Sequence, residues 1–93
     1  MLSNYQIFET DEFLKKIKKI TNRDQIFIER KLLQHIYPQL KEEPHYGNNI
    51  KKLMDYKPET WRYRIGKYRL FYVIDENEKT VYILSIDLRK DAY

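Results

Sequence analysis

The segment from Trp61 to Tyr72, WRYRIGKYRLFY, constrains the fold of this chain more than any other stretch. On both sides of Gly66, apolar and aromatic residues alternate with basic ones, which is the period of a β-strand with one buried face. Gly66 can adopt the positive φ that a tight reversal needs, so the segment predicts a β-hairpin. If the aromatic set packs in a core, the basic residues project from the opposite face. These are Arg62, Arg64 and Arg69.

A helical region precedes this hairpin. Thr10 or Asp11 can cap a first helix. Its apolar stripe, at three- and four-residue spacing, consists of Phe13, Leu14, Ile17 and Ile20. Thr21 followed by Asp24 resembles a capping box and predicts the start of a second helix. The stripe of that helix consists of Ile28, Leu32, Leu33, Ile36 and Leu40. Because the link is short, the two helices are predicted to form a hairpin.

Strand patterns lie on both sides of the helices. Residues 5–9 alternate as a short first strand, and the polar residues 42–49 predict a loop. Further strands are predicted at 50–56, 60–65, 67–75 and 80–86. The order β-α-α-β-β-β-β predicts an α+β (α/β) fold of two layers, with the helical hairpin packed on a mainly antiparallel, twisted sheet. A length of 93 residues predicts one domain, 1–93, with one modest core.

Positive charge is concentrated in one part of the chain. The whole sequence carries a net charge of +4, yet seven basic and only two acidic side chains lie between Lys51 and Arg69. An excess confined to one segment indicates a surface for a polyanion, and basic residues beside aromatic rings suit a nucleic acid. Lys51, Lys52 and Lys67 are therefore candidate contacts to it, and Arg89 and Tyr93, at the end of the chain, are candidates to complete a cationic pocket.

Composition excludes several classes of site. The chain has no cysteine, so disulfides, zinc–cysteine sites and thiol nucleophiles are excluded. Its two histidines, His35 in a helical pattern and His45 in a loop, have no companion cluster, and we expect neither a metal nor a cofactor. There is no signal-peptide core and no apolar run long enough to span a bilayer, which predicts a cytoplasmic protein without membrane contact.

Three short motifs, taken together and in order, carry a family resemblance. They are KKL at 51–53, WRYRIGKYRLFYVID at 61–75 and LRKDAY at 88–93. With the order of the predicted elements, they make the whole chain resemble the RelE/ParE toxin superfamily. The resemblance implies a RelE-like fold and a toxin of a type II toxin–antitoxin system that is held by a cognate antitoxin. It further implies a ribosome-dependent endoribonuclease that cleaves mRNA without a metal.

In that reaction the 2′-hydroxyl of the RNA attacks the adjacent phosphodiester. Arginines suit the stabilisation of the transition state because their guanidinium groups match phosphate oxygens and stay charged. By resemblance, the catalytic candidates are Arg62, Arg64, Arg69, Arg89 and Tyr93, and the three lysines above are RNA-binding candidates.

The general base stays open at this stage. Some relatives have lysines where this chain has Arg62 and Arg64, and an arginine cannot serve as a base. Leu88 stands where many relatives have a histidine. Lys52, Glu59 and His45 are the remaining candidates.

Other interpretations compete with the nuclease. A ParE-like toxin would inhibit DNA gyrase by binding, without nuclease chemistry, and a repurposed family member would act only as a binding module. At the level of single residues, Arg69 has the alternative of a structural salt bridge to Asp75 or Asp87. Tyr63, Tyr68 and Tyr72 are predicted to be core or sheet-surface rings rather than platforms for RNA bases.

Overall fold

The computed structural model describes residues 4–88 of the chain. Five strands and a helical region follow one another in the order predicted from the sequence. The elements are β1 (Gln6–Glu9), α1 (Asp11–Lys18), α2 (Asn22–Lys31), the π-helical turn η1 (Leu32–Ile36), α3 (Tyr37–Glu42), β2 (Ile50–Lys52), β3 (Trp61–Ile65), β4 (Tyr68–Asp75) and β5 (Thr80–Leu88).

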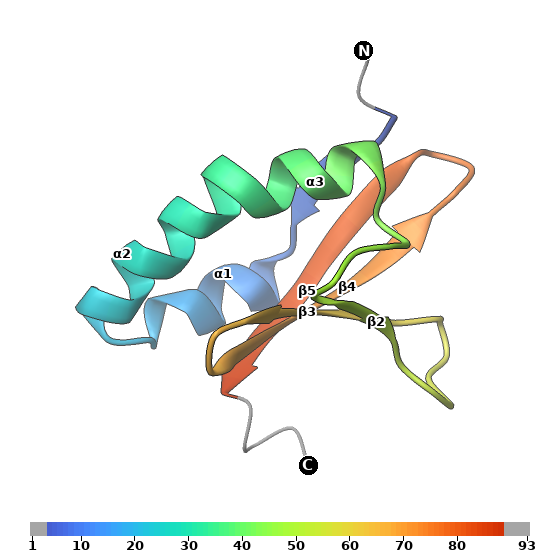
Figure 1. Ribbon diagram of the computed structural model, residues 1–93. Helices are drawn as coiled ribbons and strands as arrows, with labels where there is room; N and C mark the ends of the chain where they lie inside the picture. The colour runs from blue at the N-terminus through green and yellow to red at the C-terminus, as the bar shows by residue number, and fades with distance from the viewer. Residues whose placement is uncertain (1–3, 89–93) are drawn as a thin grey trace.

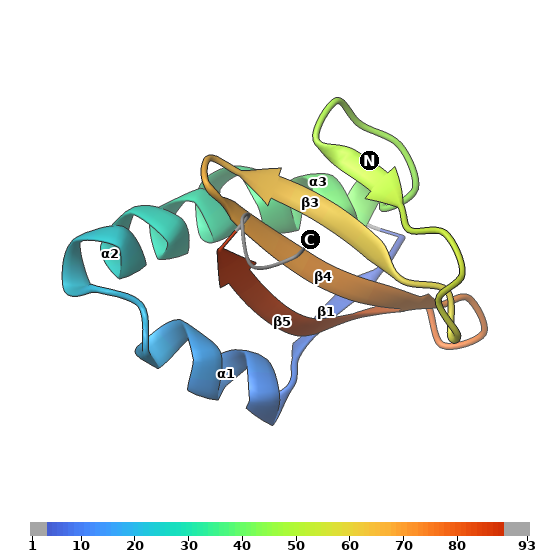
Figure 2. The same ribbon diagram turned by 90° about the horizontal axis from the view of Figure 1, so that it is seen from below.

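The strands form one mixed sheet with the order β1-β5-β4-β3-β2. β2 to β5 form an antiparallel meander, whereas β1 pairs with β5 in parallel. The helices cover one face of the sheet, as Figure 1 shows, and Figure 2 looks onto the opposite face, where β3, β4 and β5 have no helix in front of them. The predicted two-layer α+β fold is therefore confirmed.

Both predicted helix starts are present. The hydroxyl of Thr10 accepts a hydrogen bond from the amide of Phe13, and that of Thr21 accepts one from the amide of Asp24. Each hydroxyl therefore satisfies one of the donors that the first turn leaves without a partner. The carboxylate of Asp24 does not complete a capping box with Thr21. It accepts a hydrogen bond from Tyr68 instead, at 2.7 Å.

The second predicted helix continues through Pro38 by way of a wider turn. In η1 the amide of Tyr37 donates to the carbonyl of Leu32, five residues earlier. This turn lies directly before Pro38, which lacks an amide donor and whose ring crowds the preceding turn, and the wider turn accommodates it. Four stripe residues are buried: Ile28, Leu32, Ile36 and Leu40. The prediction for Leu33 was wrong, since its side chain is 70% exposed.

The core lies between the helices and the covered face of the sheet. Tyr63, Tyr68 and Tyr72 are all buried in it, as predicted. Their hydroxyls bond to the helical layer or to the loop after it: Tyr63 donates to Gln39, Tyr68 to Asp24 and Tyr72 to the carbonyl of Pro44. A buried hydroxyl is costly unless it is hydrogen-bonded. These contacts therefore join the two layers and fix how the helices lie relative to the sheet.

The hairpin of β3 and β4 has the predicted form. Ile65 pairs with Tyr68, so Gly66 and Lys67 alone form the turn. Gly66 has a φ of 57°, as the first central residue of a type II′ turn requires. The predicted strand 50–56 is much shorter, because β2 ends at Lys52 and residues 53–60 leave the sheet as a loop.

Candidate functional site

The arginines of the hairpin lie on the face of the sheet that the helices leave open. Across β3 and β4, Arg64 is paired with Arg69, and Arg62 is paired with Phe71. Paired residues share a face of the sheet, and Trp61, Tyr63 and Ile65 occupy the face toward the core. The predicted division of the hairpin into an apolar and a cationic face is thus correct.

A groove of about 810 Å³ crosses this face. It is lined by Thr10, Glu12, Leu53, Met54, Tyr56, Thr60, Arg62, Arg69, Phe71, Leu84, Ser85 and Asp87. Arg69 is only 3% exposed and forms part of the floor, whereas Arg62 is half-buried. Arg64 is exposed and lies next to Arg69 on the same face. The groove therefore combines fixed positive charge with apolar and aromatic walls.

Two carboxylates also line the groove. Asp87 lies opposite Arg69 in the register of β4 and β5, but its ion pair is with Lys16, at 3.1 Å. The hydroxyl of Ser85 also donates to Asp87, at 3.0 Å. Glu12 contacts the same lysine at 3.8 Å. Asp87, one of the two carboxylates suggested as a structural partner of Arg69, is thus bonded to Lys16.

Asp75, the other suggested partner of Arg69, lies at the far end of β4. Its carboxylate accepts a hydrogen bond from the amide of Glu78 at 3.0 Å, which stabilises the turn between β4 and β5.

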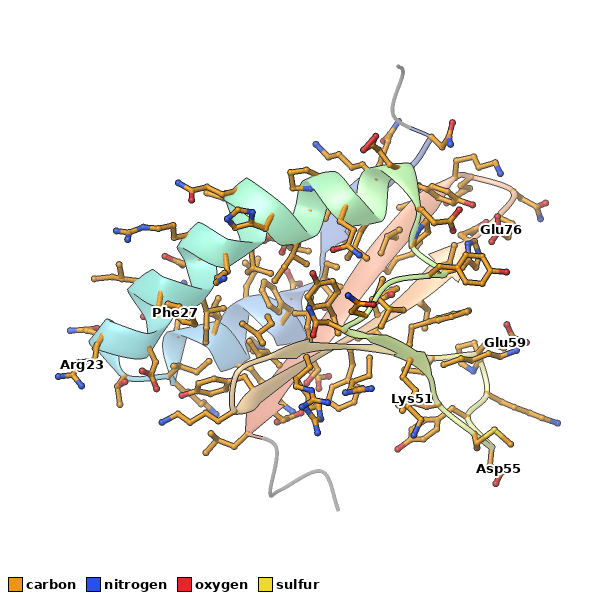
Figure 3. The ribbon with its side chains drawn as sticks, in the orientation of Figure 1. Arg23, Phe27, Lys51, Asp55, Glu59 and Glu76 are labelled. Carbon is orange, nitrogen blue, oxygen red and sulfur yellow. The ribbon has the colours of Figure 1, made fainter. Side chains whose placement is uncertain are left out.

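The three lysines predicted to bind RNA are dispersed. Lys51 is exposed and pairs with Arg62 in the register, so it extends the open cationic face toward the sheet edge, where Figure 3 labels it. Lys52 forms an ion pair with Glu59 at 3.1 Å. Lys67 forms one with Asp24 at 3.3 Å, on the side of α2. None of the three lysines lines the groove. Of the three, Lys51 is the one placed with the arginines.

Lys67 and Tyr68 both act on Asp24. The pKa of Asp24 lies below its usual range, mainly because its carboxylate accepts the hydrogen bond from Tyr68. The neighbouring charge of Lys67 lowers this pKa further. Burial raises the pKa of Tyr68 to about 12, so the hydroxyl remains a donor at neutral pH. These contacts tie the tip of the β3–β4 hairpin to the start of α2.

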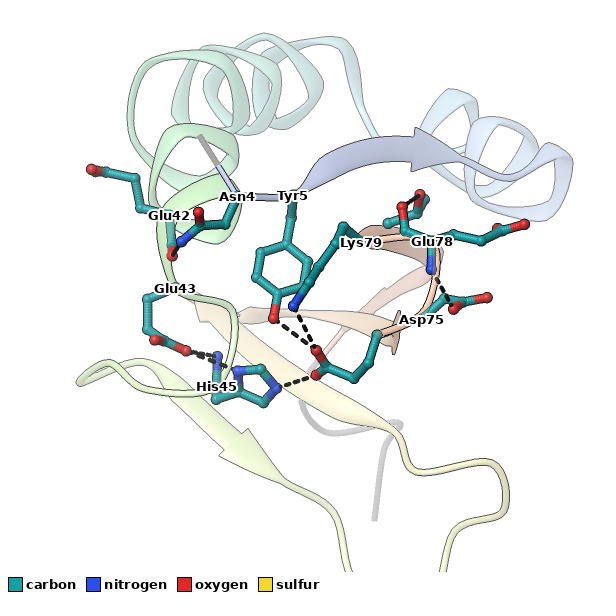
Figure 4. A network of polar contacts seen from close by, with 10 residues as sticks. Asn4, Tyr5, Glu42, Glu43, His45, Asp75, Glu78 and Lys79 are labelled. Carbon is teal, nitrogen blue, oxygen red and sulfur yellow. Dashed lines mark hydrogen bonds and ion pairs between the residues drawn. The ribbon is translucent and has the colours of Figure 1, made fainter. Parts of the chain in front are cut away.

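His45 belongs to a polar network away from the groove, shown in Figure 4. Its ring nitrogens lie 2.8 Å from Glu43 and 2.7 Å from Glu76. Glu76 also accepts a hydrogen bond from Tyr5 at 2.9 Å. The rings of His45 and Trp61 are nearly perpendicular, with 5.4 Å between their centroids. The network connects the loop after α3 with the turn between β4 and β5. His45 is thus a structural residue in this arrangement.

The candidates for the general base therefore need revision. His45, Lys52 and Glu59 do not line the groove, whereas Glu12 and Asp87 do. Sequence reasoning also missed Tyr56 and Phe71. Phe71 gave a signal, since it breaks the apolar alternation of β4 by placing an aromatic ring on the cationic face. Tyr56 gave none, because it was assigned to a strand.

Two further candidates, Arg89 and Tyr93, lie outside the described residues. Within residues 4–88 there is no group of three or more metal-ligating side chains. None of the helices in this part of the chain has the length and apolar character of a membrane span.

The architecture is similar to that of solved toxin structures. A chain of the archaeal RelE–RelB complex from Pyrococcus horikoshii OT3 is 21% identical, with a TM-score of 0.71 over 92% of this chain and 96% of that one. A chain of the toxin–antitoxin complex RelBE2 from Mycobacterium tuberculosis is 27% identical, with a TM-score of 0.71 over 96% and 95%. A variant of Escherichia coli RelE in the free state is 19% identical, with a TM-score of 0.68 over 98% and 88%.

Comparison with curated protein sequences gives no match. The family model of the ParE toxin of the type II toxin–antitoxin system parDE matches residues 7–93, which is nearly the whole chain. The chain therefore belongs to the ParE toxin family within the RelE/ParE superfamily, and it is a toxin of a type II toxin–antitoxin system with a RelE-like fold.

Proposed function

We propose that this toxin is a ribosome-dependent mRNA endonuclease. The observation that carries the proposal is the set of three arginines on two adjacent strands of the open face, with Arg64 directly opposite Arg69 and Arg62 beside them. Guanidinium groups at adjacent positions of a sheet can bind one anion together, and their planar donors match the oxygens of a phosphodiester.

The reaction is a transesterification within the RNA strand. The 2′-hydroxyl oxygen forms a bond to the adjacent phosphorus, and the bond from phosphorus to the 5′-oxygen breaks. The leaving 5′-oxygen takes up a proton from water, so the products are a 2′,3′-cyclic phosphate and a free 5′-hydroxyl. Negative charge builds up on the phosphate oxygens in the transition state, where Arg62 and Arg69 stabilise it. The attacking hydroxyl must lose a proton. The carboxylate we assign as its acceptor is Asp87, which lines the groove and is aligned with Arg69 across β4 and β5.

Arg89 and Tyr93 keep their proposed roles from the resemblance. Arg89 would supply a further phosphate contact, and Tyr93 would stack on a base or assist a proton transfer. Deletion of Tyr93, compared with Tyr93→Phe, separates these last two roles, because phenylalanine keeps the ring and removes the hydroxyl.

Mapping the ends of mRNA after incubation of purified toxin with translating ribosomes tests the nuclease. We expect new mRNA ends in the presence of ribosomes, slow or absent cleavage of naked mRNA, and no effect of chelators. The ribosome would hold the RNA in line for attack, which the groove alone does not. Rapid cleavage of naked mRNA would refute the ribosome dependence, and intact mRNA on ribosomes would refute the nuclease.

A second candidate function is inhibition of DNA gyrase by binding. The match to the ParE toxin family favours it. A supercoiling assay with purified gyrase distinguishes the two functions, since a gyrase inhibitor blocks supercoiling and leaves mRNA on ribosomes intact. If the protein does neither, both functions are refuted and the interpretation as a binding module remains.

We also propose a cognate antitoxin, with an apolar segment that docks between α1 and α2. A hollow of about 330 Å³ there is lined by Glu9, Phe13, Leu14, Ile17, Glu29, Leu32, Leu33 and Tyr37. Leu33 is 70% exposed and Leu14 is 38% exposed, and helix-in-groove recognition uses such apolar anchors. The similar chain from P. horikoshii was solved in a RelE–RelB complex and that from M. tuberculosis in a toxin–antitoxin complex. Leu33→Glu should weaken neutralisation by the antitoxin and leave toxicity intact. Unchanged neutralisation would refute this surface.

A further inference from the structure

The loop between β2 and β3 forms one wall of the arginine groove. It leaves the sheet after Lys52 and returns at Trp61, and Figure 1 shows it extending from the edge of the sheet. The amide of Leu53 donates to the carbonyl of Thr60 at 2.9 Å, which closes the loop at its base. The hydroxyl of Thr60 donates to the carbonyl of Pro58 at 3.0 Å. The loop is therefore a defined structural unit that can present side chains to the groove.

Two aromatic rings meet the groove from different elements. Tyr56, on the loop, is 54% exposed and still lines the groove. Phe71, on β4, lies directly opposite Arg62 and is half-buried. Neither ring belongs to the hydrophobic core between the helices and the sheet. In such a groove the aromatic rings can stack on the base of a nucleotide, while the neighbouring cations bind its phosphate.

We propose that Tyr56 and Phe71 hold one unpaired base of an RNA strand while Arg62 and Arg69 hold the phosphate beside it. This inference rests on the proposed nuclease function and specifies how its substrate is placed. The groove, at about 810 Å³, falls in the size range of sites that enclose small ligands. Stacking accepts any base, since every base has an aromatic face. The positive charge of this face favours RNA over an apolar peptide as the occupant.

Direct binding of a short RNA tests the proposal without any cleavage. The probes are a fluorescent 2′-O-methyl RNA hexanucleotide and a hexamer of equal charge that keeps the ribose-phosphate chain but lacks the bases. We expect Tyr56→Ala to weaken binding of the first probe by about tenfold, roughly 1.4 kcal/mol, and Tyr56→Phe to bind like the parent. Both the parent and Tyr56→Ala should bind the abasic probe equally weakly.

Tyr46→Ala is the matched control, because Tyr46 is 76% exposed and does not line the groove. It should bind both probes like the parent. Circular dichroism verifies the fold of each variant, and Phe71→Leu, which keeps an apolar side chain in β4, should show the same selective loss as Tyr56→Ala.

Several outcomes would refute the proposed base-binding site at Tyr56 and Phe71. These are parental binding by Tyr56→Ala, an equal loss on both probes, or no binding of the hexanucleotide by the parent at millimolar concentration. Loss of antitoxin binding in Tyr56→Ala with unchanged RNA binding would assign the ring to a protein partner instead. The ribosome assay is separate. Selective RNA binding without cleavage on ribosomes would support the base-binding site and refute only the nuclease.

Discussion

Replacing Tyr72 with phenylalanine removes a single hydroxyl from the centre of the protein. Tyr72 has no exposed surface, and its hydroxyl donates to the carbonyl of Pro44 at 2.7 Å. Pro44 is itself fully buried, so water cannot replace the lost donor. The contact joins β4 to the loop after α3, which also carries His45. Burial raises the pKa of Tyr72, so the hydroxyl stays protonated at neutral pH.

The magnitude follows from what the substitution leaves behind. The ring keeps its packing, so the loss is that of a buried carbonyl without this donor, about 1.5 kcal/mol of unfolding free energy within a range of roughly 1–3. For a domain of this size, 1 kcal/mol corresponds to about 4–8 °C in Tm, which gives a decrease of roughly 6–12 °C. Urea denaturation should show a lower midpoint with an unchanged slope.

Tyr82→Phe is the matched control. The hydroxyl of Tyr82 donates to Glu78 at 2.8 Å, but this contact lies at the surface, where water can replace the partner. Its removal should change the unfolding free energy by less than about 0.5 kcal/mol. Equal effects of the two substitutions, or a Tyr72→Phe variant as stable as the parent, would refute the reasoning from burial.

Four further predictions concern charge. Arg69→Ala should abolish growth inhibition in a folded protein, by loss of about 3 kcal/mol of transition-state stabilisation; full toxicity would remove Arg69 from the site. Arg64→Thr should lower toxicity and change the unfolding free energy by less than about 0.5 kcal/mol, because Arg64 is exposed; full toxicity would remove Arg64 from the site. Hydrogen bonds, mainly from His45 to Glu43 and mainly from Tyr5 to Glu76, hold the pKa values of these two glutamates below the ordinary value of a glutamate. Their stabilisation is therefore present above that ordinary value and is lost as the pH falls through the lowered pKa values. The urea midpoint of Glu76→Gln should fall less on acidification than that of the parent, and an equal fall would contradict this. Lys67→Ala should leave cleavage on ribosomes unchanged and cost at most about 1 kcal/mol of stability, and a cleavage defect would restore Lys67 to the RNA site.

Local pattern was sufficient for much of this fold. The alternation from Trp61 to Tyr72 predicts the hairpin and the face of each arginine, because side chains of a strand alternate by geometry alone. The starts of α1 and α2 were likewise readable from Thr10 and Thr21, since capping acts within one turn. These features depend on near neighbours in the chain, and the sequence contains all of that information.

Tertiary structure decided the features that join distant segments. It brings Lys67 to Asp24 and His45 to Glu76, and it exposes Leu33 on a helix whose other stripe residues are buried. No periodicity specifies which partner a side chain reaches, because that depends on how the layers pack and how the sheet twists.

The groove is the clearest case of this limit. Its arginines come from β3 and β4, Asp87 comes from β5, and Tyr56 comes from a loop that sequence reasoning assigned to a strand. The residue types were visible in the sequence, and the sequence predicted their cationic character. Their meeting in one groove follows from the pairing of β4 with both β3 and β5 and from the early end of β2, which frees the loop to form a wall of the groove. Strand pairing and loop closure are long-range events, and they decide which side chains share a site.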